Sequence, residues 1–221
     1  MKILKITVVA IISSFLMILS SNALEKRIGV AAGYTSVSAD GTETLKDSSK
    51  KSNTEASETA IIPSIFAELA MDNGFGLGIE HVPGSADINS STRSRADDDA
   101  ETSGGNKASA EIDGLTSIYL IKTFESGFFV KAGQTSTTVN TKEVLGTGST
   151  YKNVDIDGMI IGLGMHKAND SGFFYRVSGE YTDYDDISLT SQTADAVSGT
   201  KNKINASLDT TAFKFAVGKA F

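Results

Sequence analysis

Apolar and polar residues alternate with a period of two over most of this chain, as expected for β-strands whose two faces meet different surroundings. The pattern predicts eight strands, at residues 27–38, 58–71, 74–83, 109–123, 127–139, 154–167, 172–186 and 204–221. The connections between these strands alternate in length. Three are short turns that contain glycine, "DNG", "FESG" and "ANDSG", and four are long and polar. Short turns of this kind are typical of hairpins.

Alternating short and long connections are what a membrane-crossing, up-and-down β-barrel requires. We therefore predict an all-β, eight-stranded antiparallel transmembrane barrel. Its termini and short turns would lie on the periplasmic side, and its long loops would face outward. A repeated hairpin supports this interpretation, because residues 111–133 resemble residues 155–179.

The parity of the apolar residues predicts which face meets lipid. Met159, Ile161 and Leu163 share one face of their strand, and glycines occupy the other. Apolar side chains outward and small or charged ones inward reverse the pattern of a soluble barrel, and a surrounding of lipid explains the reversal. The strand at 109–123 is ambiguous, because Ile118 and Leu120 fall on the face expected to be inward.

Prolines and aromatic residues are consistent with the same arrangement. Pro63 and Pro83 fall eight and nine residues from a short turn, so both are expected near the outer rim, where water or a bulge tolerates the missing N–H. Aromatic belts are expected at the two interfaces. The candidates are Phe75, Phe128, Phe173 and Phe221 on the periplasmic side, with Tyr34, Tyr181 and Tyr184 on the outer side.

Residues 1–23 have the layout of a secretory signal peptide, with two lysines, an apolar run and a small-x-small site. We expect cleavage between Ala23 and Leu24, which leaves residues 24–221 as one outer-membrane β-barrel domain. The alternative, a membrane-anchoring helix, is disfavoured by the two serines that interrupt the apolar run. The chain carries a net charge of −7 and no cysteine. An acidic exported chain is a poor partner for nucleic acid, and no disulfide can form.

The final residues, "AFKFAVGKAF", resemble the assembly signal of bacterial outer-membrane barrels. The positions that carry the resemblance are Phe213, Phe215, Val217 and Phe221. With "FYRVSGEYTDYDD" in the preceding strand, the chain resembles the small OmpA-like and opacity-type outer-membrane proteins. The resemblance implies location in the bacterial outer membrane and insertion by the barrel-assembly machinery after escort by periplasmic chaperones. Lys219 departs from the pattern, which prefers an apolar residue third from the end.

Charged residues on inward-facing positions form the principal candidate site. They are Glu68, Glu80, Lys131, Arg176, Glu180 and Lys214. An eight-stranded barrel is just wide enough for side chains to fill it, so these charges are expected to form an ion-paired plug. The alternative is a narrow, gated ion path. Arg176, Glu180 and Lys214 lie on adjacent predicted strands at similar heights and are expected to be close together.

Catalysis and metal binding are weaker alternatives. A lipid hydrolase or acyltransferase needs a histidine near a serine or carboxylate at the lipid boundary. His81 lies outward near the outer rim and His166 inward near the periplasmic end, and neither forms such an arrangement. We therefore expect no catalytic site, no cofactor and no dedicated metal site. The acidic run at 95–101 could hold a divalent cation that bridges lipopolysaccharide, but it lacks the spacing of a calcium loop and is expected to be a solvated loop.

The function expected from these features is that of a non-enzymatic outer-membrane barrel protein. It would contribute to envelope integrity and to surface interaction through adhesin- or antigen-like loops. Its partners would be outer-membrane lipids, lipopolysaccharide, the assembly machinery with its chaperones, and an extracellular ligand of the loops. The alternatives are a small porin-like ion or solute channel and, third, a lipid-modifying enzyme.

Overall fold

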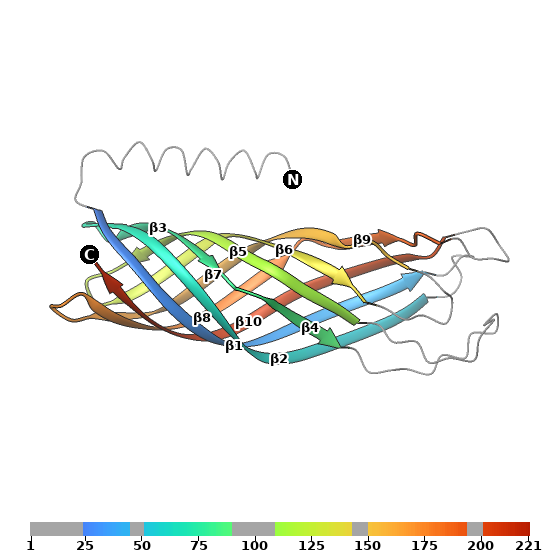
Figure 1. The fold of residues 1–221 in the computed structure, drawn as a ribbon, viewed down its shortest axis with the longest axis horizontal. Coiled ribbons are helices and arrows are strands. Elements are labelled where there is room, and N and C mark those ends of the chain that lie inside the picture. Colours follow the sequence, from blue (N-terminus) through green and yellow to red (C-terminus); the bar gives the residue numbers. More distant parts are fainter. Residues whose placement is uncertain (1–23, 45–50, 90–108, 143–149, 194–200) are drawn as a thin grey trace.

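The chain forms a closed β-barrel in the computed structural model, which describes residues 24–44, 51–89, 109–142, 150–193 and 201–221 (Figure 1). The strands are β1 (Leu24–Thr44), β2 (Lys51–Met71), β3 (Phe75–His81), β4 (Ser85–Asn89), β5 (Ser109–Thr123), β6 (Phe128–Thr141), β7 (Val154–Ala168), β8 (Phe173–Tyr184), β9 (Ile187–Thr190) and β10 (Lys203–Ala220). Among the described residues, no helix is long and apolar enough to cross a membrane.

Each strand pairs antiparallel with its neighbours in the order β1-β2-β3-β5-β6-β7-β8-β10, and β10 pairs with β1 to close the barrel. The closing register runs from Arg27 opposite Ala220 to Thr44 opposite Lys203. β4 continues the line of β3 along β5, and β9 continues the line of β8 along β10. The predicted eight-stranded antiparallel barrel is therefore confirmed, with two of its eight strands interrupted.

The three short turns are the hairpins that the sequence predicts. Gly74, Gly127 and Gly172 have φ values of 82°, 84° and 81°, a left-handed conformation that glycine adopts without steric cost. In each turn the glycine N–H donates to a carbonyl three residues earlier, as from Gly74 to Met71 at 2.8 Å. All three turns lie at the end of the barrel where the C-terminal end of β10 also lies (Figure 1).

The first long connection is shorter than predicted, because most of it is strand. Residues 39–44 and 51–58 continue the β1–β2 ladder, with Ala39 opposite Ala56, where the sequence predicted a polar loop from 39 to 58. The outward positions of β1 that lead into this extension, Ser36, Ser38 and Asp40, are polar. The barrel wall therefore rises beyond the apolar band instead of ending at it.

A band of exposed apolar side chains surrounds the part of the barrel next to the turns. Its most exposed members include Ile61 at 75%, Phe213 at 60% and Leu163 at 58%. A closed barrel with an apolar exterior is suited to immersion in hydrocarbon. The chain has the exterior of a membrane-spanning β-barrel, with Tyr34 and Tyr181 exposed near the upper edge of the band.

The structure settles one side-chain direction that the sequence left ambiguous and corrects another. Ile118 faces outward and is 39% exposed, whereas its neighbour Tyr119 is buried in the lumen. The cause is a β-bulge between Asp113 and Thr116, which reverses the parity of β5 partway along the strand. Tyr184 was also expected in the outer aromatic belt, but it is buried inside the barrel.

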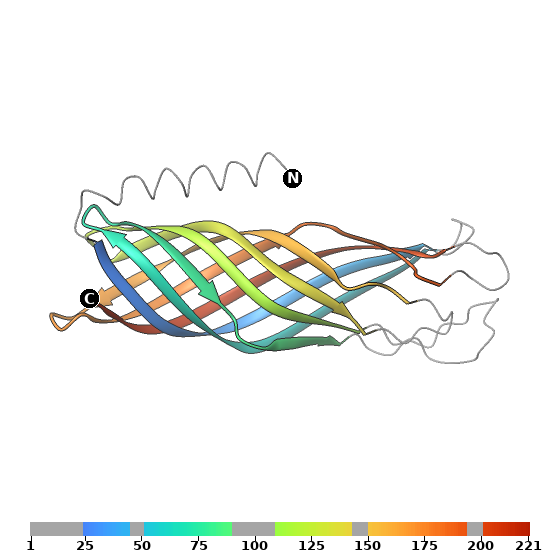
Figure 2. The ribbon, with the colours of Figure 1, turned by 45° about the horizontal axis from the view of Figure 1, so that its top comes forward.

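The barrel wall is interrupted between β2 and β4. β2 pairs with β3 only as far as Ile65 opposite His81, and β4 pairs with β5 on its other side. Residues 82–84 separate β3 from β4, and Figure 2 shows this break in the ribbon. Pro63 and Pro83 lie on the two sides of the interruption, which we call the seam. A proline lacks the N–H that a continuous ladder would need there.

Inward-facing glycines make room for aromatic rings inside the lumen. A Cβ atom added to Gly78 would lie 2.4 Å from the ring of Tyr119, and one added to Gly218 would lie 2.3 Å from the ring of Phe174. Both distances are far inside van der Waals contact. The glycines therefore set how closely the rings approach the wall.

We predict that Gly78→Ala destabilises the barrel whereas Gly179→Ala does not. Overpacking against Tyr119 is expected to lower the free energy of unfolding by about 1–3 kcal/mol. A Cβ at Gly179 meets nothing within 4 Å, so this variant is the matched control. Urea unfolding in lipid vesicles, followed by the heat-modifiable gel shift, measures both. Equal midpoints for the two variants would contradict the packing argument.

Candidate functional site

The lower layer of the lumen is built on an ion pair between β2 and β8. Arg176 donates from Nη1 to Glu68 Oε1 at 2.5 Å and from Nη2 to Oε2 at 2.6 Å. The Tyr119 hydroxyl donates to the same Oε1 at 2.8 Å, and Arg27 lies 3.9 Å from Oε2. The guanidinium and the carboxylate thus form a bidentate ion pair across the barrel, which is the strongest pairing geometry for arginine.

Aromatic rings enclose the Arg176 guanidinium. Its Cζ lies 5.0 Å from the ring centre of Phe174 and 5.5 Å from those of Phe66 and Phe129. Nε donates to His166 Nδ1 at 3.0 Å. The cation is thus held by a carboxylate on one edge, an imidazole on another and π-faces around it. This arrangement closes the lumen near its periplasmic end.

A second layer, toward the outside, consists of four charges that we call the ring: Glu80, Lys131, Glu180 and Lys214. Lys131 Nζ lies 3.2 Å from Glu80 and 2.6 Å from Glu180. Lys214 Nζ lies 2.5 Å from Glu80 and 2.8 Å from Glu180. The Ser64 hydroxyl also donates to Glu80, at 2.7 Å. Positive and negative groups alternate around the ring, so its formal charges cancel.

The two layers are continuous. Lys131 Nζ lies 4.6 Å from the ring centre of Tyr119, whose hydroxyl bonds to Glu68. Five of the six charges are buried and Lys214 is partly buried. Removal of one partner from a buried pair leaves the other uncompensated at a cost of several kcal/mol. The network therefore ties strands from opposite sides of the barrel and fills its cross-section.

A cavity of about 360 Å³ lies directly above the ring. Ser64, Glu180 and Lys214 form its polar floor. Its walls are mainly apolar and include Val37, Ala60, Ile62, Val82, Ile112, Leu115, Ile160 and Ala212. Hydroxyl side chains also contribute, from Thr35, Ser117, Thr135, Thr182 and Thr210. The volume falls at the lower end of the range found for small-molecule pockets, roughly 300–1,000 Å³.

The cavity opens through the seam. Ile61, Ile62 and Pro63 line it in succession, which requires the cavity to wrap around the edge of β2, because neighbouring residues of a strand face opposite sides. Residues 82–85 line the facing edge. Ala60 is directed inward by parity and is nevertheless exposed. The opening thus connects the interior with the side of the barrel, near the upper edge of the apolar band.

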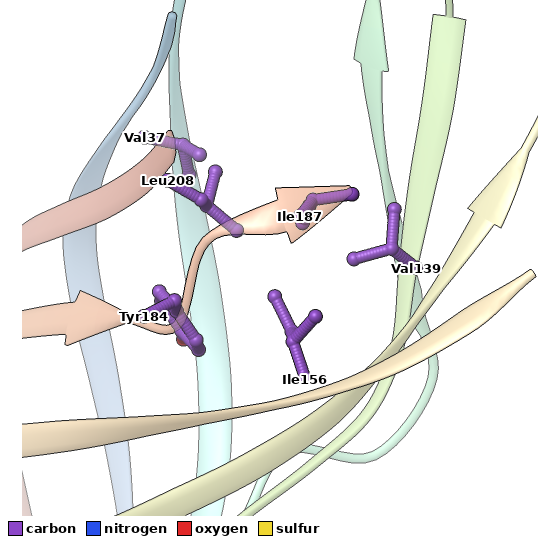
Figure 3. Close-up of a cluster of buried hydrophobic side chains, with 6 residues drawn as sticks. All are labelled: Val37, Val139, Ile156, Tyr184, Ile187 and Leu208. Carbon is purple, nitrogen blue, oxygen red and sulfur yellow. The ribbon is translucent and has the colours of Figure 1, made fainter. Parts of the chain in front are cut away.

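An apolar cluster lies above the cavity. Its members are Val37, Val139, Ile156, Tyr184, Ile187 and Leu208, which converge from six strands (Figure 3). Val37 and Tyr184 belong to both the cluster and the cavity wall. Tyr184 and Ile187 both face inward although they are three residues apart, because the break at residues 185–186 reverses the parity between β8 and β9. Because the cluster lies above the cavity, the open side of the cavity is the seam.

The structure places all six inward charges of the sequence analysis in the lumen, but one expected grouping is wrong. Glu180 and Lys214 are in contact, whereas Arg176 lies in the lower layer with Glu68. Arg176 and Glu180 are four residues apart on β8, and a strand rises about 3.3 Å per residue. The two side chains are therefore about 13 Å apart along the strand and serve different layers.

The other candidate residues lie apart from this site. Phe213, Phe215, Val217 and Phe221 face outward. His81 Nδ1 lies 3.0 Å from the Thr116 hydroxyl. Leu24 begins β1, while Ala23 and the acidic run at 95–101 lie outside the described residues. In the described part of the chain, no three His, Cys, Asp or Glu residues are grouped as metal ligands.

Sequence reasoning did not find the cavity, nor the roles of Ser64 and Tyr119 in the charge network. The available signal was the pair Pro63 and Pro83, which interrupts hydrogen bonding on two neighbouring strands at one height. The prolines were interpreted only as tolerated near the rim. Together they indicate that the two strands are not joined there.

Comparison with known proteins supports the fold. No protein-family model matches the chain, and no curated protein matches its sequence. The crystal structure of the outer membrane protein OprG from Pseudomonas aeruginosa is similar, with 14% identity and a TM-score of 0.62, over 90% of this chain and 97% of OprG. The outer membrane protein AlkL, solved by solid-state NMR in lipid bilayers, has 9% identity and a TM-score of 0.58, over 90% of this chain and 91% of AlkL.

These likenesses show the fold alone, because the identities are low. They support a small outer-membrane barrel, and the closer resemblance to OmpA-like and opacity-type proteins stays a prediction. The outer membrane protease OmpT from Escherichia coli, with 9% identity over 91% of this chain and 99% of OmpT, has a TM-score of 0.48 and carries no argument about function.

We predict that Glu68→Gln lowers the free energy of unfolding by about 3–5 kcal/mol, because it leaves Arg176 buried without its carboxylate. Glu58→Gln is the matched control, since Glu58 is exposed, and it is expected to change stability by about 0.5 kcal/mol or less. Denaturant unfolding in vesicles, followed by circular dichroism, measures both. A Glu68→Gln barrel as stable as the control would contradict a structural role for the pair.

Proposed function

We propose that this protein admits small, largely apolar molecules to the outer membrane through the side of the barrel. The observation that carries the proposal is the cavity above the ring, which has apolar walls and opens through the seam. A molecule that leaves the cavity by this opening arrives at the upper edge of the apolar band. It therefore passes into lipid without crossing the periplasmic half of the lumen.

The ring and the lower layer support this lateral route over an axial channel. Four ring charges and the Glu68–Arg176 pair cross the lumen below the cavity. An ion that moved along the axis would have to separate these buried pairs. We therefore propose passage through the wall of the barrel, in place of the porin-like axial channel that the sequence analysis gave as an alternative.

The surface-interaction hypothesis stays a prediction. The central parts of the four long connections, residues 45–50, 90–108, 143–149 and 194–200, lie outside the described residues. The absence of enzymatic activity likewise stays a prediction. Neither hypothesis conflicts with a lateral route, because outer loops and the wall of the barrel are separate parts of the molecule.

We predict that a bulky group placed at the seam blocks uptake. The chain has no cysteine, so Ala60→Cys, at the cavity opening, and Ser57→Cys, exposed on the outward face of β2, can each be labelled selectively. Cells that produce the protein should take up the hydrophobic dye N-phenylnaphthylamine faster than cells without it. A bulky thiol reagent should abolish this gain in Ala60→Cys and leave it intact in Ser57→Cys. Equal dye uptake by cells with labelled and with unlabelled Ala60→Cys would contradict the lateral route.

A second prediction concerns ion conduction. Purified protein in planar bilayers is expected to show no stable conductance, because the ring and the lower layer fill the lumen. The double variant Lys131→Ala with Glu180→Ala removes one charge of each sign and should conduct more readily. Stable conductance by the unmodified protein would show that the network is a gated path and not a plug.

A further inference from the structure

The cavity combines two kinds of surface, and this combination restricts what can bind there. Ile62, Leu115 and Ile160 contribute apolar wall, and Ser64 with two ring members contributes the charged and polar floor. Hydroxyl side chains, among them Thr35, Ser117 and Thr182, also line the cavity between these parts. An apolar molecule can pack against the apolar walls but forms no hydrogen bond with the floor. A fully polar molecule suits the floor but not the walls.

Lys214 is the ring member that reaches the cavity. Its side chain is 16% exposed, compared with 5% for Lys131. Its Nζ contacts Glu80 at 2.5 Å and Glu180 at 2.8 Å. An ammonium group has three N–H donors, and within the described residues these two carboxylates are its bonded partners. The third donor is therefore available to a molecule in the cavity.

Glu180 supplies the complementary acceptor. Oε1 contacts Lys131 at 2.6 Å and accepts a hydrogen bond from the Ser178 hydroxyl at 3.4 Å, and Oε2 contacts Lys214 at 2.8 Å. An ionised carboxylate has about four acceptor positions, so these contacts leave capacity for a further donor. Glu180 and Lys214 both line the cavity. The floor therefore presents a donor and an acceptor side by side.

We propose that the cavity selects neutral amphiphiles, namely short aliphatic alcohols whose hydroxyl meets the floor and whose chain packs against the walls. The inference rests on the proposed function and names the substrate class of the same cavity. A hydroxyl accepts from Lys214 and donates to Glu180, so it satisfies both groups at once. The alkyl chain then extends past Ile62 toward the seam.

Related compounds fit less well for separate reasons. An alkane displaces water from the floor without replacing its hydrogen bonds, which costs affinity. A carboxylate places a third negative charge beside Glu80 and Glu180, whose charges the two lysines already balance, and like charges in a poorly solvated site repel strongly. The cavity should therefore rank an alcohol above the alkane and the carboxylate of equal chain length.

Methyl NMR of the protein in lipid nanodiscs tests this order directly. Hexanol, hexane and hexanoate are titrated while isoleucine methyl signals are followed. Ile112 and Ile160 line the cavity, and Ile28 and Ile161 face the lipid, so the latter pair reports simple partition into the bilayer. Hexanol is expected to saturate the cavity signals with an affinity about tenfold higher than hexane. Hexanoate is expected to bind most weakly.

The variant Lys214→Met with Glu180→Gln removes the donor and the ionised acceptor while the remaining ring charges stay balanced. Its preference for hexanol over hexane should fall to about twofold or less. Lys122→Met is the matched control, because Lys122 lies over the ring of Phe75 at the periplasmic end, and it should retain the full preference. If the double variant does not fold, the order of affinities in the unmodified protein still tests the selection of alcohols.

The outcomes separate the two proposals. Equal affinity for hexanol and hexane at the cavity signals, or tighter binding of hexanoate, overturns the selection of alcohols and leaves the lateral route standing. No response of Ile112 and Ile160 to any of the three compounds overturns both proposals. A double variant that folds and keeps the hexanol preference overturns the roles given to Lys214 and Glu180.

Discussion

Charges inside a narrow barrel must neutralise one another, because lipid surrounds the wall and little water can reach the centre. This constraint organises the lumen. Glu68 and Arg176 satisfy it in one layer, and the ring satisfies it in another. The inward glycines and rings then fill the remaining space around these pairs. The same packed layers define the floor of the cavity, so the structural network and the candidate site are one arrangement.

The period of two along the chain was enough to predict the number and direction of the strands. Lipid exposes one face of each strand, which makes the pattern clear, and Gly74, Gly127 and Gly172 mark the turns. The pattern did not predict the side-chain direction correctly where the backbone departs from regular pleating. The bulge between Asp113 and Thr116 reversed the parity of β5, and the alternation of apolar residues shows this only as the ambiguity of Ile118 and Leu120, without locating the inserted residue.

The contents of the lumen were predictable, but their pairing was not. Inward parity identifies a charged residue without indicating which strand across the barrel it meets. Glu68 and Arg176 are separated by 108 residues, and their contact depends on the stagger of all strands between them. The cavity was missed for a related reason: its opening is the absence of pairing between β2 and β4, and sequence patterns predict strands more readily than gaps between them.

The seam leaves two strand edges without partners, and such edges commonly recruit a strand from another molecule. Pro63 and Pro83 occupy these edges, and neither can donate a backbone hydrogen bond. The two prolines that prevent pairing at the seam therefore also make these edges poor templates for an intermolecular β-sheet.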